Sequence, residues 1–301
     1  MPVHTPVLLN EVVELMHVQP AGSYIDATYG RGGHSRALLA QLGQHGRLLV
    51  VDRDPQALAD AHALAASDPR VTVADGAYSR LAEFAAGERG AVDGILLDVG
   101  ISSPQVDDAA RGFSFRHDAP LDMRMDPRHG ESAAEWIAHA SETELSEVLW
   151  HYGEERRSRQ IARRIVAARA QAPLATTGAL AELVRDCYPY KGGRIDPATR
   201  SFQAIRIHIN DELNELERAL EAALGLLAPG GRLLVIAFHS LEDRLVKQRF
   251  RALDAAARQA PADQAPSFRL VRRKSWQAGA AECAANPRAR SARLRVLERV
   301  A

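Results

Sequence analysis

Tyr24-Ile-Asp-Ala-Thr-Tyr-Gly-Arg-Gly-Gly-His34, followed by Leu48-Leu-Val-Val-Asp52, is the stretch of sequence that decides the fold. It contains an apolar run, a glycine-rich turn, a helical stretch and a second apolar run that ends in an acid, which predicts a β-α-β unit. Glycines in such a turn let the backbone approach a ligand, and an acid about 20 residues further on can accept both hydroxyls of a ribose. A glycine turn alone is weak support, but the turn, the spacing and Asp52 together predict a site for a nucleoside cofactor.

The details of the turn separate two kinds of cofactor. A dinucleotide fingerprint has the form G-x-G-x-x-G, whereas here Ser35 stands where the third glycine belongs. Asp26 lies four residues before Gly30, at the end of the first strand, and a carboxylate there suits a cationic amino-acid tail better than a pyrophosphate. S-adenosylmethionine has such a tail and NAD does not, so we expect S-adenosylmethionine as the cofactor.

The composition excludes several other classes of protein. The 301 residues are 46% hydrophobic with a formal net charge of zero, which is typical of a globular protein without an overall field for nucleic acid. Cys187 and Cys283 lie far apart, with no C-x-x-C spacing and no histidine cluster, so neither a disulfide framework nor a metal is expected. No signal-peptide pattern opens the chain, and its longest apolar strand, Leu233–Phe238, is too short to cross a bilayer. We therefore expect a cytoplasmic protein that does not bind membranes.

The last part of the chain is locally basic. Residues 268–301 hold nine Arg or Lys against Glu282 and Glu298, a local charge of about +7. Such a patch meets phosphate in nucleic-acid-binding proteins, although a solvated surface is the alternative. The tail is therefore a candidate contact for RNA.

Four apolar runs in the first third of the chain predict buried parallel strands, because a helical stretch separates each run from the next. They lie at Tyr24–Ala27, Leu48–Asp52, Val71–Ala74 and Gly94–Asp98, after a short helix at Val7–Met16. The alternation then stops between residues 107 and 210, where the sequence shows helix patterns and no convincing strand. These helix patterns predict an inserted all-helical domain, with helices at Ser132–Ala140, Glu142–His151, Arg156–Arg169 and Thr177–Cys187.

The α/β pattern resumes at residue 211 with a helix near Asp211–Leu227, which Ala228-Pro-Gly-Gly231 is expected to stop. The strand Arg232–Phe238, a helix from Ser240 and the strands Phe268–Val271 and Arg293–Leu297 complete the pattern, and residues 253–267 look like a mobile connection. The expected fold is α/β, a doubly wound, seven-stranded sheet ending in an antiparallel pair. This is the Rossmann-like class I architecture of SAM-dependent methyltransferases. Residues 1–106 and 211–301 would form that domain, with 107–210 as an RNA-recognition insert after strand four.

Ligands of an open α/β sheet bind beyond the carboxyl ends of its strands. Besides the glycine turn and Asp52, two segments reach this edge of the predicted sheet. In Asp75-Gly-Ala-Tyr78, the ring of Tyr78 could stack on an adenine, or it could belong to the core. The other segment begins at Asp98 and continues to Gln105.

Ser102-Ser103-Pro104, after the fourth strand, indicates the class of methyl acceptor. An exocyclic amine on an aromatic ring is a poor nucleophile, so an enzyme must accept hydrogen bonds from its NH₂ group and align it with the methyl group. A hydroxyl and the backbone carbonyls of this segment could do so, although an ordinary Ser-Pro turn is an equal alternative. Methylation at C5 of a pyrimidine is disfavoured because that route needs a cysteine nucleophile, and neither cysteine follows strand four or five.

The segment after the fifth strand, Phe238-His239-Ser240-Leu-Glu-Asp243-Arg244, lies on the same edge. Ser240 and Asp243 match a helix capping box, which favours a structural role for both residues. His239, at the strand end, could contact the target base or the RNA.

Motifs along nearly the whole chain resemble those of the RsmH (MraW) family, bacterial methyltransferases that act on cytosine N4 of 16S ribosomal RNA. The resemblance runs from His4-Thr-Pro-Val-Leu-Leu9 to Asn286-Pro-Arg-Ala-Arg-Ser291 and includes Gly30-Arg-Gly-Gly-His-Ser35, Asp52-Arg-Asp-Pro55, Asp93-Gly-Ile-Leu-Leu-Asp98, Ser102-Ser-Pro-Gln105, Arg111-Gly-Phe-Ser-Phe115, Pro120-Leu-Asp-Met-Arg-Met-Asp126, Tyr152-Gly-Glu-Glu155, Phe202-Gln-Ala204 and Phe238 to Arg244. It implies a decoding-centre cytidine as the acceptor. Tyr78 stands where the family commonly has Phe. The cofactor contacts that the resemblance implies are Gly32, Gly33, His34, Asp52, Tyr78, Asp98 and Gln105.

The expected reaction is therefore methyl transfer from S-adenosylmethionine to N4 of a cytidine in the small ribosomal subunit, with Ser102, Ser103 and Pro104 as the catalytic segment. The helical insert and the basic tail would grip the RNA while the target cytosine is displaced into the pocket. Two other classes stay open: an amine methyltransferase with another acceptor, such as adenine N6 or a protein side chain, and an RNA assembly factor that binds S-adenosylmethionine without catalysis. The sequence does not fix the oligomeric state, and a homodimer is one option.

Overall fold

The computed structural model describes residues 6–189, 196–259 and 268–300, and the chain divides into two compact units. The first unit comprises Met1–Gly100 and Leu213–Ala301, and the second comprises Ile101–Glu212. The second unit thus begins and ends outside the predicted insert of residues 107–210. His4, the first residue of the family resemblance, lies outside the described residues.

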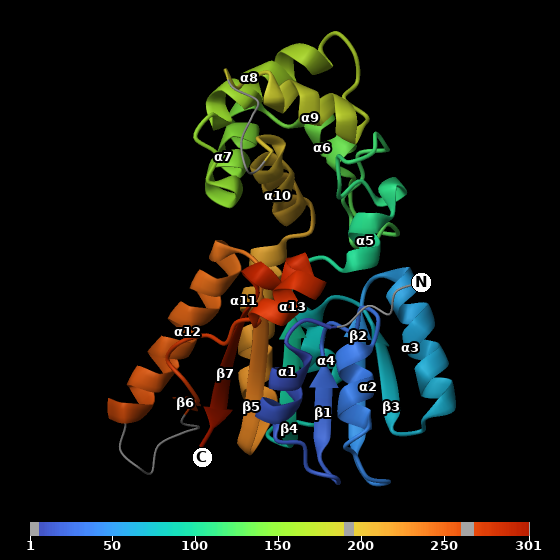
Figure 1. Cartoon of the computed structure of the whole chain (residues 1–301), viewed down its shortest axis with the longest axis vertical. Helices are drawn as coiled ribbons and strands as arrows, with labels where there is room; N and C mark the ends of the chain where they lie inside the picture. Colours follow the sequence, from blue (N-terminus) through green and yellow to red (C-terminus); the bar gives the residue numbers. More distant parts are fainter. Residues whose placement is uncertain (1–5, 190–195, 260–267, 301) are drawn as a thin grey trace. The chain divides into compact units, whose positions relative to one another are not determined.

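The first unit contains a seven-stranded sheet with the strand order β3-β2-β1-β4-β5-β7-β6 within the described residues (Figure 1). The strands β1 to β5 run parallel, whereas β7 is antiparallel to both β5 and β6. This order, with its antiparallel pair, confirms the predicted class I methyltransferase fold. The strands are β1 Ser23–Asp26, β2 Arg47–Asp52, β3 Val71–Asp75, β4 Val92–Asp98, β5 Leu227–Ala237, β6 Phe268–Leu270 and β7 Arg293–Arg299.

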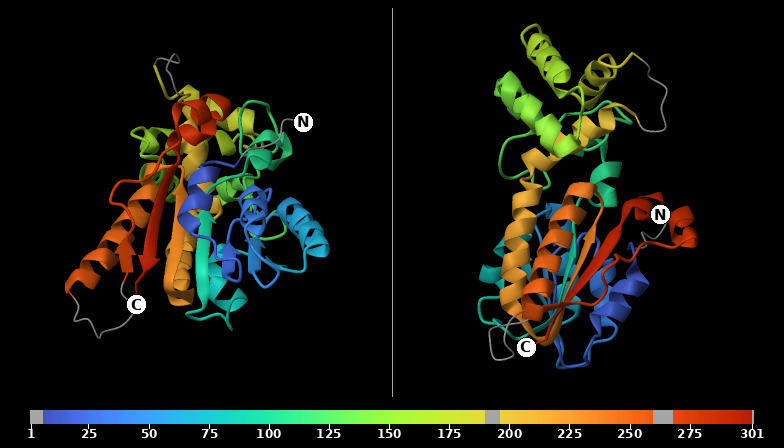
Figure 2. Two further views of the ribbon diagram at one scale, coloured as in Figure 1. Left: turned by 60° about the horizontal axis from the view of Figure 1, so that its bottom comes forward. Right: turned by 90° about the vertical axis from the view of Figure 1, so that its left-hand side faces the viewer.

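Helices cover both faces of this sheet. Successive strand residues point to opposite faces, so an apolar strand needs a helix layer on each side. In β4, Ile95 and Leu97 pack in the cluster that contains α11 and α12, whereas Leu96 packs in the cluster that contains α1 and α2. Figure 2 shows α11 and α12 on one face of the sheet and α1 on the other. None of the helices in the described part of the chain is both long and apolar enough to cross a membrane. The helices of this unit are α1 Leu9–Met16, α2 Gly33–Leu39, α3 Pro55–Ser67, α4 Leu81–Phe84, α11 Glu212–Leu226, α12 Ser240–Gln259 and α13 Ala280–Ala285.

Two predictions about this unit were wrong in detail. The segment Ala228-Pro-Gly-Gly231 does not separate α11 from a later strand, because β5 already begins at Leu227. Leu227 pairs with Val92 and Arg232 with Gly94, so residues 228–231 form a bulge within the strand. The predicted mobile connection over 253–267 is helical up to Gln259, where α12 ends, and residues 260–267 lie outside the described part.

The second unit is helical and has its own core, which Trp136, Leu149, Ile161 and Ile205 help to form. The helix α10 Ala198–Ile209 packs against α7 and contributes several core side chains, but the sequence patterns above did not predict it. The other helices of this unit are α5 Ser103–Asp107, α6 Ala133–His139, α7 Glu142–Gly153, α8 Ser158–Arg169 and α9 Thr177–Arg185.

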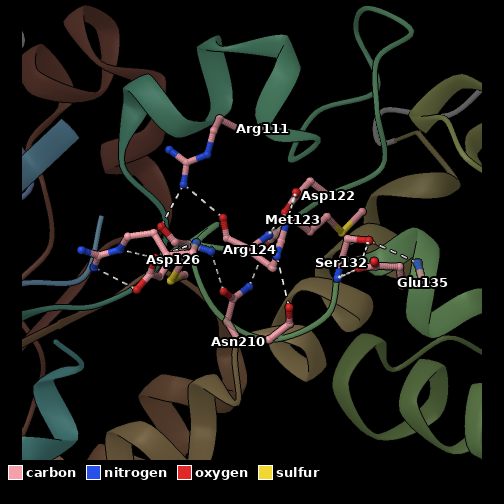
Figure 3. Close-up of polar contacts among 11 residues, drawn as sticks. Arg111, Asp122, Met123, Arg124, Asp126, Ser132, Glu135 and Asn210 are labelled. Atoms are coloured by element: carbon pink, nitrogen blue, oxygen red, sulfur yellow. Dashed lines mark hydrogen bonds and ion pairs between the residues drawn. The ribbon is translucent and has the colours of Figure 1, made fainter. Parts of the chain in front are cut away.

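Asn210, directly after α10, holds the irregular segment that connects α5 to α6 (Figure 3). Its side-chain amide donates to the carbonyl of Met123 at 2.7 Å and accepts from the backbone N–H of Met125 at 2.7 Å. The guanidinium of Arg111 donates to the Met125 carbonyl at 2.8 Å. Met123 is buried and adopts φ +64°, a conformation that costs free energy for a residue with a side chain. The surrounding hydrogen bonds therefore stabilise a strained turn in the motif Pro120–Asp126.

Candidate active site

The glycine turn between β1 and α2 adopts the conformations that its sequence predicts. Gly30 and Gly32 have φ values of +57° and +65°, which glycine adopts without steric cost. Gly32 is the N-cap residue of α2. At Gly33 a Cβ atom would overlap the ring of Pro6, so that position has no room for a side chain. A Cβ atom at Gly32 would likewise meet the side chains of Tyr29 and Arg36, so neighbouring protein atoms leave room only for glycine at both positions. Contact of Gly32 and Gly33 with the cofactor stays a prediction.

Asp52, the last residue of β2, binds this turn. Its Oδ2 accepts the backbone N–H of Gly30 at 2.8 Å, and its Oδ1 accepts the N–H groups of Arg53 and Asp54 at 2.7 and 2.9 Å. Burial raises the pKa of Asp52 to about 6, against the opposing effect of these hydrogen bonds. A carboxylate has about four acceptor positions, so Asp52 keeps capacity for a further donor such as a ribose hydroxyl.

Asp26, the last residue of β1, is buried and bound to Ser35. The Ser35 hydroxyl donates to Asp26 Oδ2 at 2.6 Å, and the Thr28 N–H approaches Oδ1 at 3.2 Å. Burial raises the pKa of Asp26, although both hydrogen bonds act in the opposite direction. Ser35 occupies the place of the third glycine in a dinucleotide fingerprint, and its partner explains why a hydroxyl is useful there. The sequence showed both residues but not this bond.

Asp98, the last residue of β4, carries an acceptor without a partner. Its Oδ1 is buried and makes no hydrogen bond to any residue that the structure describes. Its Oδ2 lies 3.7 Å from Nδ1 of His34, whose Nε2 lies 3.0 Å from the carbonyl of Val7. The pKa of Asp98 is raised well above its usual value, first by burial and then by the negative charges of Asp26 and Glu242. A cationic group would relieve both costs, which fits the predicted amino-acid tail of the cofactor.

The capping box at the start of α12 lies one residue earlier than predicted. The Glu242 carboxylate accepts the N–H of His239 at 3.2 Å, and the His239 ring nitrogen Nδ1 accepts the Glu242 N–H at 3.4 Å. Asp243 instead forms an ion pair with Arg295, with oxygen-to-nitrogen distances of 2.7 and 3.0 Å. Since α12 starts at Ser240, the residue before it is His239, and the prediction of a Ser240–Asp243 box was wrong. Glu242, buried beside Asp98, was absent from the predicted site.

Tyr78 begins a short 3₁₀ helix, Tyr78–Arg80, shortly after β3. Its side chain is partly buried and packs against the hydrophobic cluster on the α11 face of the sheet. The ring thus contacts the core, and its stacking on an adenine stays a prediction.

The predicted catalytic residues belong to the second unit, where they open α5. Ser102 is the N-cap residue, with Ser103 and Pro104 in the first turn of the helix. The Ser102 hydroxyl accepts the N–H of Gln105 at 3.5 Å, and the Gln105 amide oxygen accepts the Ser102 N–H at 2.9 Å. The structure therefore gives Ser102 and Gln105 a capping role that the sequence analysis missed. The spacing S-x-x-Q is the signal that could have revealed it.

A basic surface hollow of about 450 Å³, here called the α12 hollow, lies between α12 and the segment after β6. Arg295 is engaged by Asp243, and the Arg272 guanidinium stacks on Trp276 at 4.5 Å. Lys247 and Arg273 have no carboxylate partner among the described residues. Some cations of the basic tail therefore make contacts within the protein. The remaining ones line the hollow together with cations of α12. The hollow is lined by Lys247, Arg251, Arg272, Arg273, Lys274, Ser275, Gln277 and Arg295.

Comparisons with known proteins extend over nearly the whole chain. The family model of the MraW methylase family matches residues 1–300. The ribosomal RNA small subunit methyltransferase H of Dechloromonas aromatica (strain RCB) is 54% identical over 306 residues, covering 99% of this chain and 98% of that protein. The protein of the same name from Xanthomonas campestris pv. campestris (strain 8004) is 53% identical over 302 residues, covering 99% and 87%. A solved rRNA methylase from Streptococcus thermophilus aligns with a TM-score of 0.43 and 12% identity over 97% of this chain and 94% of that one. The family model matches almost every residue of this chain, and both relatives share more than half of the aligned residues with it. This chain therefore belongs to the MraW methylase family.

Proposed function

We propose that this chain transfers a methyl group from S-adenosylmethionine to the exocyclic N4 amine of a cytidine in small-subunit ribosomal RNA. The family and the names of its relatives support ribosomal RNA as the substrate. The observation that carries the cofactor assignment is the unpartnered, buried Oδ1 of Asp98, near the acids Asp26 and Glu242. The negative charge of these acids favours a cation. The glycine turn that Asp52 binds precedes Asp98 in the chain.

The proposed roles of the cofactor-binding residues follow from these contacts. Gly32 and Gly33 contact the cofactor from the turn between β1 and α2, Asp52 accepts the ribose hydroxyls, and Asp98 with His34 holds the amino-acid tail. S-adenosylmethionine supplies an electrophilic methyl group on a sulfonium. The charge of that sulfonium is a further reason why acids suit this edge of the sheet.

The proposed acceptor site begins four residues after Asp98, at Ser102-Ser103-Pro104. An aromatic amine needs orientation more than it needs a strong base, because its proton becomes acidic once the nitrogen has gained the methyl group. The capping box fixes the backbone of this segment, and the Ser102 hydroxyl oxygen, which accepts one N–H, keeps a second lone pair to accept from the amine. A rigid segment of this kind can position an amine with little loss of entropy on binding.

The helical unit and the α12 hollow are the proposed RNA contacts. Lys247, Arg251, Arg273 and Lys274 present positive charge without a carboxylate partner in the described chain. Counterion release from RNA phosphates would then make binding dependent on salt.

The decisive experiment is methyl transfer from labelled S-adenosylmethionine to small ribosomal subunits from cells that lack this gene, followed by nucleoside mass spectrometry. N4-methylated cytidine would support cofactor, acceptor and reaction together. Label in N6-methyladenosine or in protein would favour the alternative amine acceptors. Absence of label despite measured cofactor binding would favour an RNA assembly factor without catalysis.

A further inference from the structure

The second unit contains a surface hollow of about 760 Å³ between α7 and α8, here called the Trp150 hollow. Sites for small ligands typically range from about 300 to 1,000 Å³, so one nucleotide unit could be accommodated. No residue of this hollow belongs to the predicted catalytic or cofactor site. Its lining is Glu142, Thr143, Ser146, Glu147 and Trp150 on one side, and Arg156, Arg157, Ser158, Arg159, Gln160 and Arg163 on the other.

Trp150 is the outstanding side chain of this hollow. It is 53% exposed, and only one other large hydrophobic residue, Val300, is exposed in the described part of the chain. Glu147 and Thr143 precede it by three and seven residues on the same helix, so the three side chains share one face of α7. An exposed indole offers a flat surface on which any unstacked nucleobase can stack.

Cations lie on the opposite wall of the hollow. Arg156 and Arg159 have no polar or charged partner among the described residues. Arg163 and Glu142 approach to 3.8 Å, and Arg157 donates to the carbonyl of Cys187 at 2.7 Å. Two guanidinium groups are thus available for a phosphate, while the unpaired carboxylate of Glu147 can accept from an exocyclic amine.

The motif Tyr152-Gly-Glu-Glu155 fixes the corner that joins these two walls. Gly153 packs closely on α10, because a Cβ atom there would lie 2.7 Å from the carbonyl of Arg200. Glu155 is fully buried and accepts the Arg157 N–H at 2.8 Å and the Tyr188 hydroxyl at 2.6 Å. The corner therefore presents the arginines from a rigid turn, which lowers the entropy that a bound phosphate would cost.

We propose that the Trp150 hollow binds one unstacked nucleotide of the RNA substrate, away from the methylated base. Trp150 stacks on the base, Arg156 and Arg159 bind the adjoining phosphate, and Glu147 accepts from a base amine. This assignment rests on the proposed function, since it presumes an RNA substrate. It explains why a large apolar ring is exposed to water beside unpaired arginines. A bound nucleotide would cover the ring with its base and the arginines with its phosphate.

Tryptophan fluorescence of the full chain, titrated with a short single-stranded oligoribonucleotide, tests this site. The titration uses a Trp276→Phe background, because Trp276 lies beside the α12 hollow and could report RNA bound there. Stacking on Trp150 should quench the remaining signal, and adding Trp150→Phe should abolish that quenching, because Trp136 is buried. Trp150→Ala should weaken binding by about 5- to 150-fold, the usual range for loss of one stacked base, and Trp150→Phe by less. Arg159→Ala should lower the slope of log affinity against log salt by about 0.7, whereas Arg116→Ala, an exposed arginine elsewhere in the unit, should weaken binding less.

Three results would overturn the inference. The first is equal quenching with and without Trp150→Phe in the Trp276→Phe background. The second is unchanged affinity in Trp150→Ala. The third is that Trp150→Ala loses as much affinity for a duplex of the same sequence as for the single strand. A change of oligomeric state in Trp150→Ala without loss of RNA binding would assign the hollow to a second copy of the chain instead. The proposed function is judged separately, because N4-methylcytidine formation by the wild-type chain does not depend on any of these variants.

Discussion

Asp52 accepts the backbone N–H of Gly30 at 2.8 Å, so the acid that ends β2 fixes the turn that follows β1. Gly30 adopts φ +57°, and the hydrogen bond stabilises this unusual conformation. The same carboxylate accepts two further N–H groups and is also the predicted ribose acceptor. The charge of one side chain therefore controls both the shape of the glycine turn and the proposed contact with the cofactor.

Replacement of Asp52 by Asn should weaken S-adenosylmethionine binding by about 1–3 kcal/mol, because an amide offers one acceptor oxygen where the carboxylate offers two. In the wild type, affinity should also fall as the pH drops through about 6, since protonation removes acceptor capacity. Calorimetric titrations at several pH values would measure both effects. Unchanged affinity in Asp52→Asn would contradict the ribose assignment, and a persisting decline near pH 6 in that variant would assign the titration to another group.

The raised pKa of Asp52 also predicts how stability depends on pH. Between its unfolded value near 3.8 and its folded value of about 6, the folded chain binds a proton that the unfolded chain releases. The contribution of Asp52 to the free energy of unfolding is therefore present at low pH and is lost as the pH rises through this window. Urea unfolding of wild type and Asp52→Asn should give stability profiles whose difference changes over this window. A constant difference would show that Asp52 has an ordinary pKa.

Ser102 has a capping role and a proposed chemical role, and two substitutions separate them. Ser102→Ala should destabilise the start of α5 by about 0.5–2 kcal/mol through loss of the cap. Ser102→Gly keeps most of the N-cap stability but removes the side-chain acceptor for the amine. If the hydroxyl acts in catalysis, both variants should lose methyl transfer while cofactor binding is retained. Full activity in Ser102→Gly would leave Ser102 with the cap alone.

Asn210 should be important for the stability of the second unit. Its side chain is 6% exposed and satisfies the backbone groups of Met123 and Met125. Asn210→Ala leaves both buried groups without their partner, at about 1–3 kcal/mol each. Asn210→Asp keeps the acceptor for Met125 but turns a carboxylate oxygen toward the Met123 carbonyl, so it isolates the Met125 bond and is not a control for overall stability. Hydrogen exchange of the Met125 amide should accelerate strongly in the alanine variant and less in the aspartate variant, and equal exchange in all three proteins would contradict this role.

Periodicity predicted the strands of the sheet because buried parallel strands are continuous apolar runs. The helix α10 was missed, since the polar residue Ser201 lies on its buried face, whose partners come from α7 and α9. The segment Ala228-Pro-Gly-Gly231 was misassigned for a related reason. Composition indicates a turn there, but pairing with β4 on both sides keeps it within the strand. Contacts with distant parts of the chain determine the structure of both segments, and the local sequence does not reveal these contacts.

The acids of the site could be located from sequence because each ends a strand, as Asp26, Asp52 and Asp98 do. The protonation states of these acids could not be predicted from sequence. The pKa of Asp98, for example, depends on burial and on Glu242, which is 144 residues away in the chain. Trp150, the proposed nucleotide contact, was not singled out by the sequence analysis either. A single aromatic residue in a helix pattern belongs to a core more often than to a surface, and only its 53% exposure distinguishes the two.

The α12 hollow leads to the last prediction, in which charge reversal separates available cations from engaged ones. Lys247→Glu with Arg273→Glu should reduce RNA affinity about tenfold or more at moderate salt and flatten its salt dependence, because two phosphate contacts are lost. Arg89→Glu, an exposed position before the central strand β4, introduces half of that change in net charge and should have clearly less than half of the effect.

Arg295 provides an internal comparison for the same hollow. Its side chain is 10% exposed and bound to Asp243, so Arg295→Gln should destabilise the fold more than it weakens RNA binding. Electrophoretic or fluorescence binding assays at several salt concentrations, beside urea unfolding, would distinguish these effects. Equal RNA affinities of the Lys247 and Arg273 double variant and of Arg89→Glu would exclude the α12 hollow as an RNA contact. The helical unit would then have to supply the phosphate contacts alone.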